Sequence, residues 1–338
     1  MMLFTEGYTM DANSEDGHVN NGREAVGRRY LFFDDHIIEK KDNLTRTLHT
    51  PEKQGAVLTP DQWWEKGLVY AFSPPIYVPE EDVYKWVYRP YYKNYSALAV
   101  SKDGVHWEKP ELGVYEFEGR KDHSIFSDRR ILQVVENPDP PDPSRRYMAL
   151  AEKTPVASPD LVHWKEVGAA DLPGGDSGTL TYDEEENRFL APVKASGKHR
   201  YRQFDLVESK DFNTWTEARP FMVPDERDQE LAVERIRRWL SSPNRPKPLF
   251  VEPSPESGWA PPDNIRNLPK RHSSWNAQIY NVGVFPYHGY YVAILAMYYP
   301  TGVWLPEHKN TAGFSMLELA VSRDMEQWTR LREPFIEP

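Results

Sequence analysis

The chain of 338 residues contains no cysteine, which excludes disulfide bonds and thiol chemistry. Absence of cysteine is typical of a reducing compartment, and no basic region followed by an apolar run opens the sequence. We therefore expect a cytoplasmic protein without a signal peptide. No run approaches the ~18 consecutive apolar residues of a membrane-spanning helix. Because Lys and Arg (41) are fewer than Asp and Glu (52), we expect neither a nucleic acid nor an anionic membrane as partner.

Signatures of several common chemistries are missing as well. The sequence has no Gly-rich phosphate loop, no HExxH zinc motif and no GxSxG nucleophile elbow. Its ten His residues include no pair at the spacing of a transition-metal site. We therefore predict no cofactor and no metal ion.

Aromatic residues and proline are abundant instead. Aromatic side chains make up 13% of the chain and supply a large potential core. The 30 Pro residues disfavour a mainly helical protein, because helix interiors tolerate proline poorly. Short strands joined by many turns fit this composition better.

A pattern Ser-x-Asp-x-x-x-Trp occurs four times, at Ser101–Trp107, Ser158–Trp164, Ser209–Trp215 and Ser322–Trp328. Each copy follows an apolar, strand-like run, and two further strand-like runs precede it. Ser and Asp suit a turn because their short side chains hydrogen-bond nearby backbone amides. Three strands, the turn and a fourth strand opened by Trp make a four-stranded antiparallel unit. Repeated units of this kind are the blades of a β-propeller.

The fold prediction is therefore an all-β, five-bladed β-propeller of four-stranded antiparallel blades. We place it in one domain over residues 28–338, after a flexible N-terminal arm at 1–27. An insertion is expected at 219–275, with one helix from Asp225 to Leu240. The four blades that carry the repeat are expected at 63–108, 122–166, 176–217 and 276–331. Two strand-like runs at 28–50 either contribute to a fifth sheet or close the ring.

Four blocks, in order, resemble bacterial proteins described as glycoside hydrolases of the invertase and arabinanase type. The blocks are LFFDDHIIEKKDNLTRTLHTPEK at 31–53, SKDGVHWEKPELGVYEFEGRKD at 101–122, DSGTLTYDEEENRF at 176–189 and SRDMEQWTRLREPFIEP at 322–338. The resemblance implies a five-bladed propeller with its active site at the central funnel. The chain departs from the family in two ways. Relatives commonly continue past the last block into another complete blade, so the propeller is either closed by other segments or incomplete at the C-terminus. Where the family reads DSQN, this chain has Asp176-Ser177-Gly178-Thr179.

Hydrolysis of a glycosidic bond needs a protonated carboxylic acid and an ionised carboxylate. In a propeller, the residues that begin the inner strands face the mouth of the channel. The candidate catalytic residues are Asp176 after a Pro-Gly-Gly turn, Asp122 before the expected second inner strand, and Glu318 among alternating apolar residues. The resemblance adds Asp35 as a funnel-facing acid. The structural alternative for each is a solvated turn, a strand cap or an exposed blade face, and the repeat residues Asp103, Asp160, Asp211 and Asp324 are expected to be structural.

Cations and aromatic residues are expected beside the acids. Arg89 interrupts an aromatic strand, where a buried charge must be paired or face a ligand. Lys194 has a similar place in the third blade. The remaining candidates for substrate binding lead into or begin the fourth inner strand: Arg271, His272, Tyr280 and Asn281. Several cations near acids suit an anionic sugar such as a uronate, and surface ion pairs are the alternative interpretation.

The leading functional hypothesis is a glycosidase that binds an oligosaccharide in the funnel. One alternative is a sugar-binding propeller without turnover. Another is a glycoside phosphorylase, with phosphate held among Arg89, Lys194, Arg271 and His272.

Overall fold

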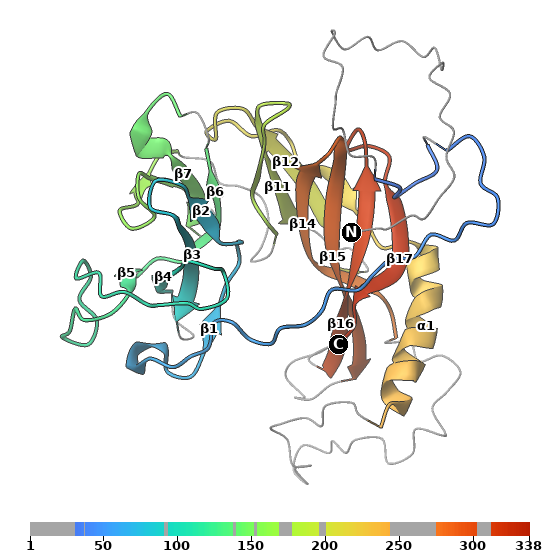
Figure 1. Ribbon diagram of the computed structural model, residues 1–338, viewed down its shortest axis with the longest axis horizontal. Helices are drawn as coiled ribbons and strands as arrows, with labels where there is room; N and C mark the ends of the chain where they lie inside the picture. Colours follow the sequence, from blue (N-terminus) through green and yellow to red (C-terminus); the bar gives the residue numbers. More distant parts are fainter. Residues whose placement is uncertain are drawn as a thin grey trace.

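The chain folds as an all-β propeller whose blades follow one another along the sequence (Figure 1). The computed structural model describes residues 31–36, 38–90, 94–137, 140–151, 154–168, 178–195, 201–243, 275–302 and 312–338. Four antiparallel sheets are formed by these residues. No helix among them is long and apolar enough to cross a membrane.

Each blade is a meander of adjacent strands. Blade one contains β1 (Val69–Tyr70), β2 (Ile76–Val78), β3 (Val83–Pro90), β4 (Ser96–Ser101) and β5 (Ile125–Ser127). Blade two contains β6 (Ile131–Glu136), β7 (Tyr147–Ala151), β8 (Thr154–Ser158) and β9 (Lys165–Glu166). Blade three contains β10 (Thr181–Asp183), β11 (Arg188–Lys194), β12 (Phe204–Ser209) and β13 (Arg219–Met222). Blade four contains β14 (Gln278–Tyr287), β15 (Tyr290–Gly302), β16 (Ala312–Ser322) and β17 (Thr329–Ile336). In blade one, β1 and β2 both pair with β3, so together they form one interrupted inner strand.

Two short 3-10 helices and one α-helix accompany the sheets in the described part of the chain. They are η1 (Trp63–Glu65), η2 (Pro143–Arg145) and α1 (Glu226–Ser241). The predicted helix is confirmed, and Asp225 caps it by accepting a hydrogen bond from the amide of Asp228. Its buried residues Ala232, Ile236 and Leu240 are spaced four apart and form one apolar stripe.

The repeat forms the predicted turn in all four copies. In the second copy, the Ser158 hydroxyl accepts from the amide of Leu161 (2.9 Å). Asp160 accepts from the amides of Val162 and His163 (2.9 and 2.8 Å). The residue after the Asp has a positive φ in every copy: Gly104 (74°), Leu161 (71°), Phe212 (63°) and Met325 (64°). Three of the four are bulky residues buried to 0–1% exposure, so core packing holds a backbone conformation that they would otherwise avoid.

The inner strands of blades three and four lie side by side and run in the same direction. The Thr179 hydroxyl donates to the carbonyl of Val282 (3.5 Å), and the Thr181 hydroxyl to that of Val284 (2.6 Å). Two residues further along blade three's inner strand correspond to two residues further along that of blade four, so the two strands are parallel. We call the end at which the inner strands begin the mouth, and the opposite end the closed end. The C-terminus follows β17 at the mouth, on the lower side of Figure 1.

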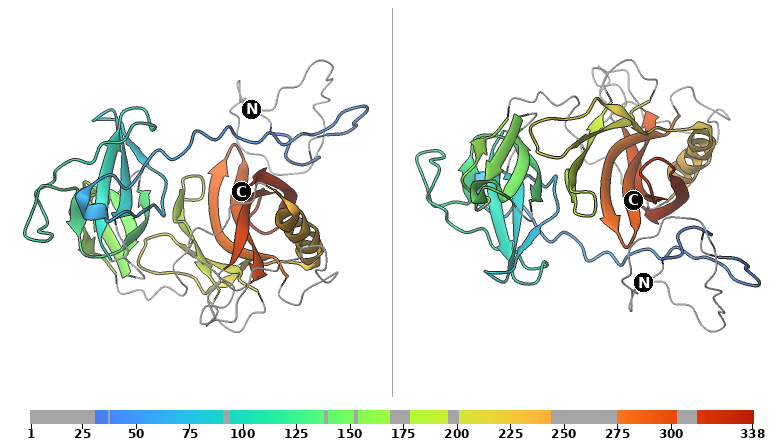
Figure 2. Two further views of the ribbon diagram at one scale, coloured as in Figure 1. Left: turned by 90° about the horizontal axis from the view of Figure 1, so that it is seen from below. Right: turned by 90° about the horizontal axis from the view of Figure 1, so that it is seen from above.

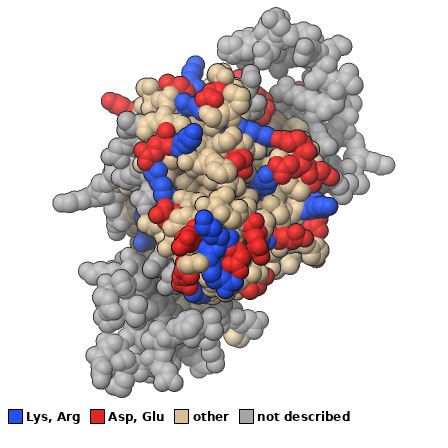
Figure 3. Space-filling view, turned by 90° about the vertical axis from the view of Figure 1, so that its left-hand side faces the viewer, with Lys and Arg blue, Asp and Glu red and all other residues tan. Residues whose placement is uncertain are grey.

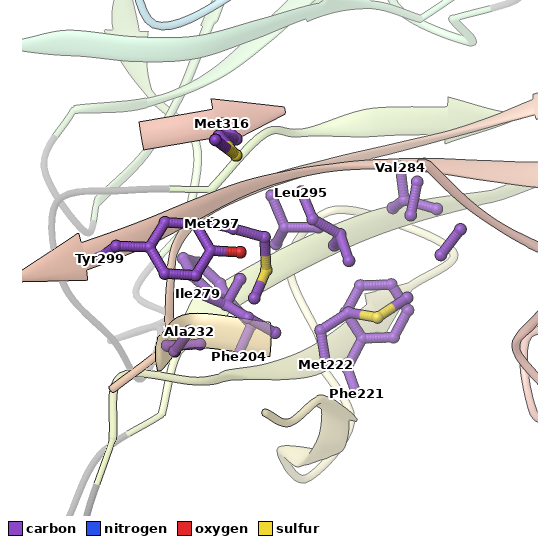
Figure 4. Packing of buried hydrophobic residues seen from close by; sticks show 14 of the residues in the cluster. Phe204, Phe221, Met222, Ala232, Ile279, Val284, Leu295, Met297, Tyr299 and Met316 are labelled. Atoms are coloured by element: carbon purple, nitrogen blue, oxygen red, sulfur yellow. The ribbon is translucent and has the colours of Figure 1, made fainter. Parts of the chain in front are cut away.

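The largest core cluster lies between blades three and four and extends under α1. Phe204 and Met222 from blade three meet Leu295 and Met297 from blade four (Figure 4). Ala232 of α1 joins the same cluster, so the helix covers the outer part of the blade three–blade four interface. Burial of large side chains here contributes on the order of 2 kcal/mol each to the free energy of unfolding.

Charges on the side formed by blades one and two are interspersed rather than segregated (Figure 3). Lys85 pairs with Glu81 (2.6 Å), and Arg146 pairs with both Glu80 and Glu136. Lys85 and Arg146 are thus both neutralised by acids of blades one and two.

The structure differs from the predicted boundaries in several places. β13 begins at Arg219, inside the expected insertion, so the insertion starts only after the outer strand of blade three. The strand-like runs expected at 28–50 are not strands in the described part of that range, and the described residues form four blades rather than five. This segment runs instead from blade four to blade one (Figure 2). Leu31, Phe33 and Leu48 pack on blade four, and Leu58 and Trp63 pack on blade one.

We expect Asp160→Asn to weaken the fold without touching the mouth. Partial burial acts to raise the pKa of Asp160, but hydrogen bonds from the His163 amide and ring and from Val162 outweigh it and lower the pKa to about 2. The charged form is therefore favoured in the folded state. Its stabilisation is present at neutral pH and is lost as the pH falls from the ordinary value of 3.8 toward 2.

Urea unfolding checks this prediction. At pH 7 the variant should lose about 1 kcal/mol of unfolding free energy, and the difference should shrink at pH 3. Asp42→Asn, which alters an exposed pair with Lys40, is the matched control and should change little. A loss that is equal at both pH values would contradict the assigned role of the carboxylate.

Candidate functional site

Two predicted residues meet at the mouth, at the junction of blades three and four. Lys194 is the last residue of β11, and Tyr280 lies near the beginning of β14. The ammonium nitrogen of Lys194 is 4.9 Å from the centre of the Tyr280 ring, within the range of a cation–π interaction. The ends of neighbouring inner and second strands thus bring together a cation and an aromatic ring that are 86 positions apart in the sequence.

A β-bulge places Tyr280 at the surface. Ile279 pairs with Met297 and Asn281 pairs with Ala296, so Tyr280 is the extra residue of the strand. Bulges redirect a side chain, and the Tyr280 side chain is 44% exposed between neighbours that are more buried. The Asn281 carboxamide stays local, accepting from the amide of Val282 (2.9 Å).

Arg202 is a mouth residue that the sequence analysis missed. Its guanidinium carbon lies 5.4 Å from the Tyr280 ring centre and 5.8 Å from that of Tyr298. One of its N–H groups donates to the Gln278 side-chain oxygen. The only sequence signal is its place just before the strand of the third repeat, which does not distinguish it from other turn arginines. We call Lys194, Arg202, Gln278, Tyr280 and Tyr298 the mouth cluster.

The second ring of the cluster packs against Gly313. Tyr298 lies on β15 opposite Gln278, and a Cβ added at Gly313 would come within 2.6 Å of its ring. Glycine at this position leaves room for the ring where it lies. Burial raises the pKa of Tyr298, whereas the neighbouring Arg202 acts in the opposite direction. The phenol is therefore neutral at physiological pH.

Gly178 joins the inner strands of blades two and three. The side-chain amide of Gln133 on β6 donates to the Gly178 carbonyl (2.7 Å). Gly178 has a φ of 142°, and an added Cβ would lie 2.0 Å from the carbonyl oxygen of Pro192. No other residue fits this position, so the glycine that replaces an amide residue in the family block is required by the close approach of β11.

Two arginines lie at the mouth end of blades one and two. Arg89 is next to last in β3, is 9% exposed, and lies 5.7 Å from the Phe72 ring centre. Arg130 immediately precedes β6 and is half-buried. Arg89 was predicted and Arg130 was not. Together with Lys194 and Arg202 they give the mouth a cationic character in three successive blades.

Three predicted site residues lie outside the described residues: Asp176, Arg271 and His272. Asp176 stands two positions before Gly178 in the sequence. Among the residues that the structure describes, no group of three or more His, Asp or Glu side chains is arranged to hold a metal ion.

Asp35 lies at the closed end, which does not agree with the funnel-facing position implied by the family resemblance. Its neighbour Asp34 accepts from Arg323 (3.2 Å) and from Tyr290 (3.3 Å), both at closed-end turns of blade four. The Asp35 carboxylate pairs with Lys41 (3.1 Å) and Arg46, and the hydrogen bond from Lys41, followed by Arg46, lowers its pKa. The reason is that residues around it form no inner strand and pack onto blade four instead.

Asp122 belongs to the outer edge of blade one rather than to the start of the second inner strand. The outer strand of blade one is interrupted: Glu108 bridges to Val100, and β5 returns to pair with the beginning of β4. Asp122 precedes β5, and its exposed carboxylate pairs with Arg120, which lowers the pKa to about 2. The inner strand of blade two begins nine residues later, at Ile131.

Glu318 is also placed away from the mouth cluster, in a buried ion-pair network. It lies on β16 opposite Leu295, on the face turned toward blade three and α1, and is fully buried. Its carboxylate pairs with Arg235 of α1 and with Arg330 of β17 (3.0 Å). Arg330 and Arg332 also pair with Asp228 (2.6 Å each), and Arg332 with Asp225 (2.5 Å). Three acids and three arginines balance here, which marks a structural network that fixes α1 to blade four.

Two pockets among the described residues lie away from the mouth cluster. One, of about 320 Å³, is lined by Phe221, Trp328 and Arg330 between β13 and β17. The other, of about 520 Å³, is lined by Glu208, Asp211 and Trp215 beside the third repeat turn. Both are next to blade edges, and the convergence of cations and rings at the mouth is the stronger indication of a functional site.

No family model and no curated protein matches the sequence. Solved structures that are similar include an α-L-arabinofuranosidase from Fusarium graminearum in complex with an iminosugar inhibitor, an endo-arabinase from Bacteroides thetaiotaomicron and a thermostable family-43 glycoside hydrolase. Each is 10% identical to this chain, with TM-scores of 0.40, 0.42 and 0.43. The matches cover 78%, 78% and 80% of this chain, and 66%, 80% and 75% of the respective structures.

The network around Glu318 predicts a large stability loss on substitution. Glu318→Gln leaves Arg235 and Arg330 without their shared buried partner, so the free energy of unfolding should fall by about 3 kcal/mol. Chemical denaturation measures this loss. Glu337→Gln is the matched control, because it removes a helix-to-blade pair in which Arg238 and Glu337 are 59% and 57% exposed. That control should lose less than about 0.5 kcal/mol. Unchanged stability in Glu318→Gln would contradict the structural role.

Proposed function

We propose that this protein is a glycoside hydrolase-like propeller that binds a sugar at the mouth cluster and cleaves a glycosidic bond there with Asp176. The observation that carries the proposal is the cluster itself, two tyrosine rings and two cations gathered at the ends of strands from blades three and four. The resemblance of the four sequence blocks to invertase- and arabinanase-type enzymes supports the same function.

The chemistry of the cluster suits a sugar. Tyrosine presents an apolar ring face for the C–H groups of a pyranose or furanose, and a hydroxyl for hydrogen bonding. Tyr280 is well exposed, whereas the side chains of Gln278 and Asn281 are engaged within the protein. The positive charges of Lys194 and Arg202 favour an anionic sugar over a neutral one. The Tyr280 ring already displaces water from one side of each cation, so less water has to be removed when an anion binds.

The proposed chemistry is acid–base hydrolysis with Asp176 as one of the two carboxyl groups. Two positions in the sequence separate it from Gly178, whose carbonyl accepts a hydrogen bond from Gln133 just before the inner strand of blade three.

A second function, a sugar-binding propeller without turnover, is favoured by one specific observation. Three of the four proposed acids, Asp35, Asp122 and Glu318, lie away from the mouth cluster, and each is ion-paired. A site with a single carboxylate binds a sugar and lacks the second group that hydrolysis requires.

A substrate screen with a matched pair of variants separates these functions. The full chain is incubated with neutral and acidic oligosaccharides, with and without phosphate, and the released reducing ends are measured. Hydrolysis predicts turnover independent of phosphate, whereas phosphate-dependent turnover assigns a phosphorylase. Asp176→Asn should lower turnover at least about 100-fold, because it removes the titrating group and keeps the shape. Asp35→Asn should leave turnover unchanged, since Asp35 lies at the closed end.

Sugar binding without product from any substrate would assign the binding function. Full activity of Asp176→Asn would overturn its catalytic role, and loss of activity in a folded Asp35→Asn variant would show that the closed end takes part in the reaction. Thermal unfolding of both variants controls for folding.

A further inference from the structure

Arg202 differs from the other arginines around it. The five other described arginines of blades three and four each make an ion pair: Arg188, Arg219, Arg323, Arg330 and Arg332. Arg202 has no carboxylate partner among the described residues, although it is half-buried. A partly desolvated cation is costly unless an anion or strong acceptor binds it, so this position is suited to a ligand anion.

The guanidinium group of Arg202 is oriented before any ligand arrives. It lies over the rings of Tyr280 and Tyr298, and one N–H group donates to Gln278. The backbone is fixed too, because the amide of Ile279 donates to the Arg202 carbonyl (3.0 Å). The planar guanidinium carries parallel N–H groups along its edges, and one of its N–H groups is used by Gln278.

We infer that the sugar bound at the mouth carries a carboxylate and that Arg202 binds this group, which makes Arg202 a specificity-determining residue. The inference rests on the proposed function in that it takes a sugar to be the ligand of the mouth cluster. Two parallel N–H groups match the two coplanar oxygens of a carboxylate, as in a uronate, and this bidentate geometry is stronger than a single hydrogen bond. The Tyr280 ring lies between the two cations, 4.9 Å from the Lys194 ammonium nitrogen and 5.4 Å from the Arg202 guanidinium carbon, and would contact the rest of the sugar.

Binding measurements with paired ligands test the inference without depending on turnover. Oligomers of D-galacturonate and of D-glucuronate are titrated against the full chain by calorimetry, each beside its methyl ester, which keeps the sugar and removes the charge. At least one acid should bind at least about tenfold more tightly than its ester. Arg202→Lys should reduce that preference at least about fivefold, because an ammonium group loses the bidentate geometry, and Arg202→Gln should abolish it. Arg237→Lys, on the exposed side of α1, is the matched control and should bind like the unaltered chain.

The possible outcomes separate this inference from the proposed function. Equal affinity for acid and ester, or a preference that survives Arg202→Gln, overturns the role of Arg202. Competition by inorganic sulfate or phosphate as strong as that by the uronate shows that the bound group is not a carboxylate and also overturns it. If neutral sugars bind and are cleaved while uronates do not bind, the glycosidase proposal stands and the carboxylate inference fails. If none of these sugars binds, the inference fails together with sugar binding at the mouth.

Discussion

The blades depend on one small interaction, the pair of hydrogen bonds that the Asp of each repeat accepts from the backbone amides two and three residues ahead. These bonds let the intervening residue take a left-handed conformation and insert Leu161, Phe212 or Met325 into the core. The turn then returns the chain at the closed end of each blade. The position of the next inner strand, and with it the set of residues at the mouth, follows from this turn.

The repeat made the blades predictable. Its fixed Ser and Asp form the same local hydrogen bond in every copy, from the Ser hydroxyl to the Asp carboxylate. The helix at Glu226–Ser241 was predictable for the same reason, because its cap and its apolar spacing are local. Closure of the propeller by the N-terminal segment could not be predicted in the same way. Whether the run at 31–50 pairs as a strand depends on which surface it meets, and in the structure Leu31 and Phe33 pack on blade four without joining a sheet. Apolar residues alone do not distinguish these cases.

Site residues at the ends of strands could be predicted from the sequence. Residues inside a strand could not, because the register of the strand decides which face of the sheet they point to. Lys194 and Tyr280 were found because each stands at the end or the beginning of a recognisable strand. Glu318 alternates with apolar residues exactly as a channel-facing acid would, and only the arginines at positions 235 and 330 reveal that its face is covered. Arg202 was missed because its significance lies in the absence of a carboxylate partner among the described residues, and this is a property of three-dimensional neighbours.

The ion-pair network under α1 has a consequence for how the chain is made. Asp228 precedes its partners Arg330 and Arg332 by 102 and 104 residues. During synthesis the ribosome releases the helix long before these arginines, so its acidic end stays hydrated until about a hundred further residues have emerged. Docking of α1 therefore waits for β17, and a nascent chain stopped before residue 330 leaves Asp228 without the two arginines that allow it to be buried.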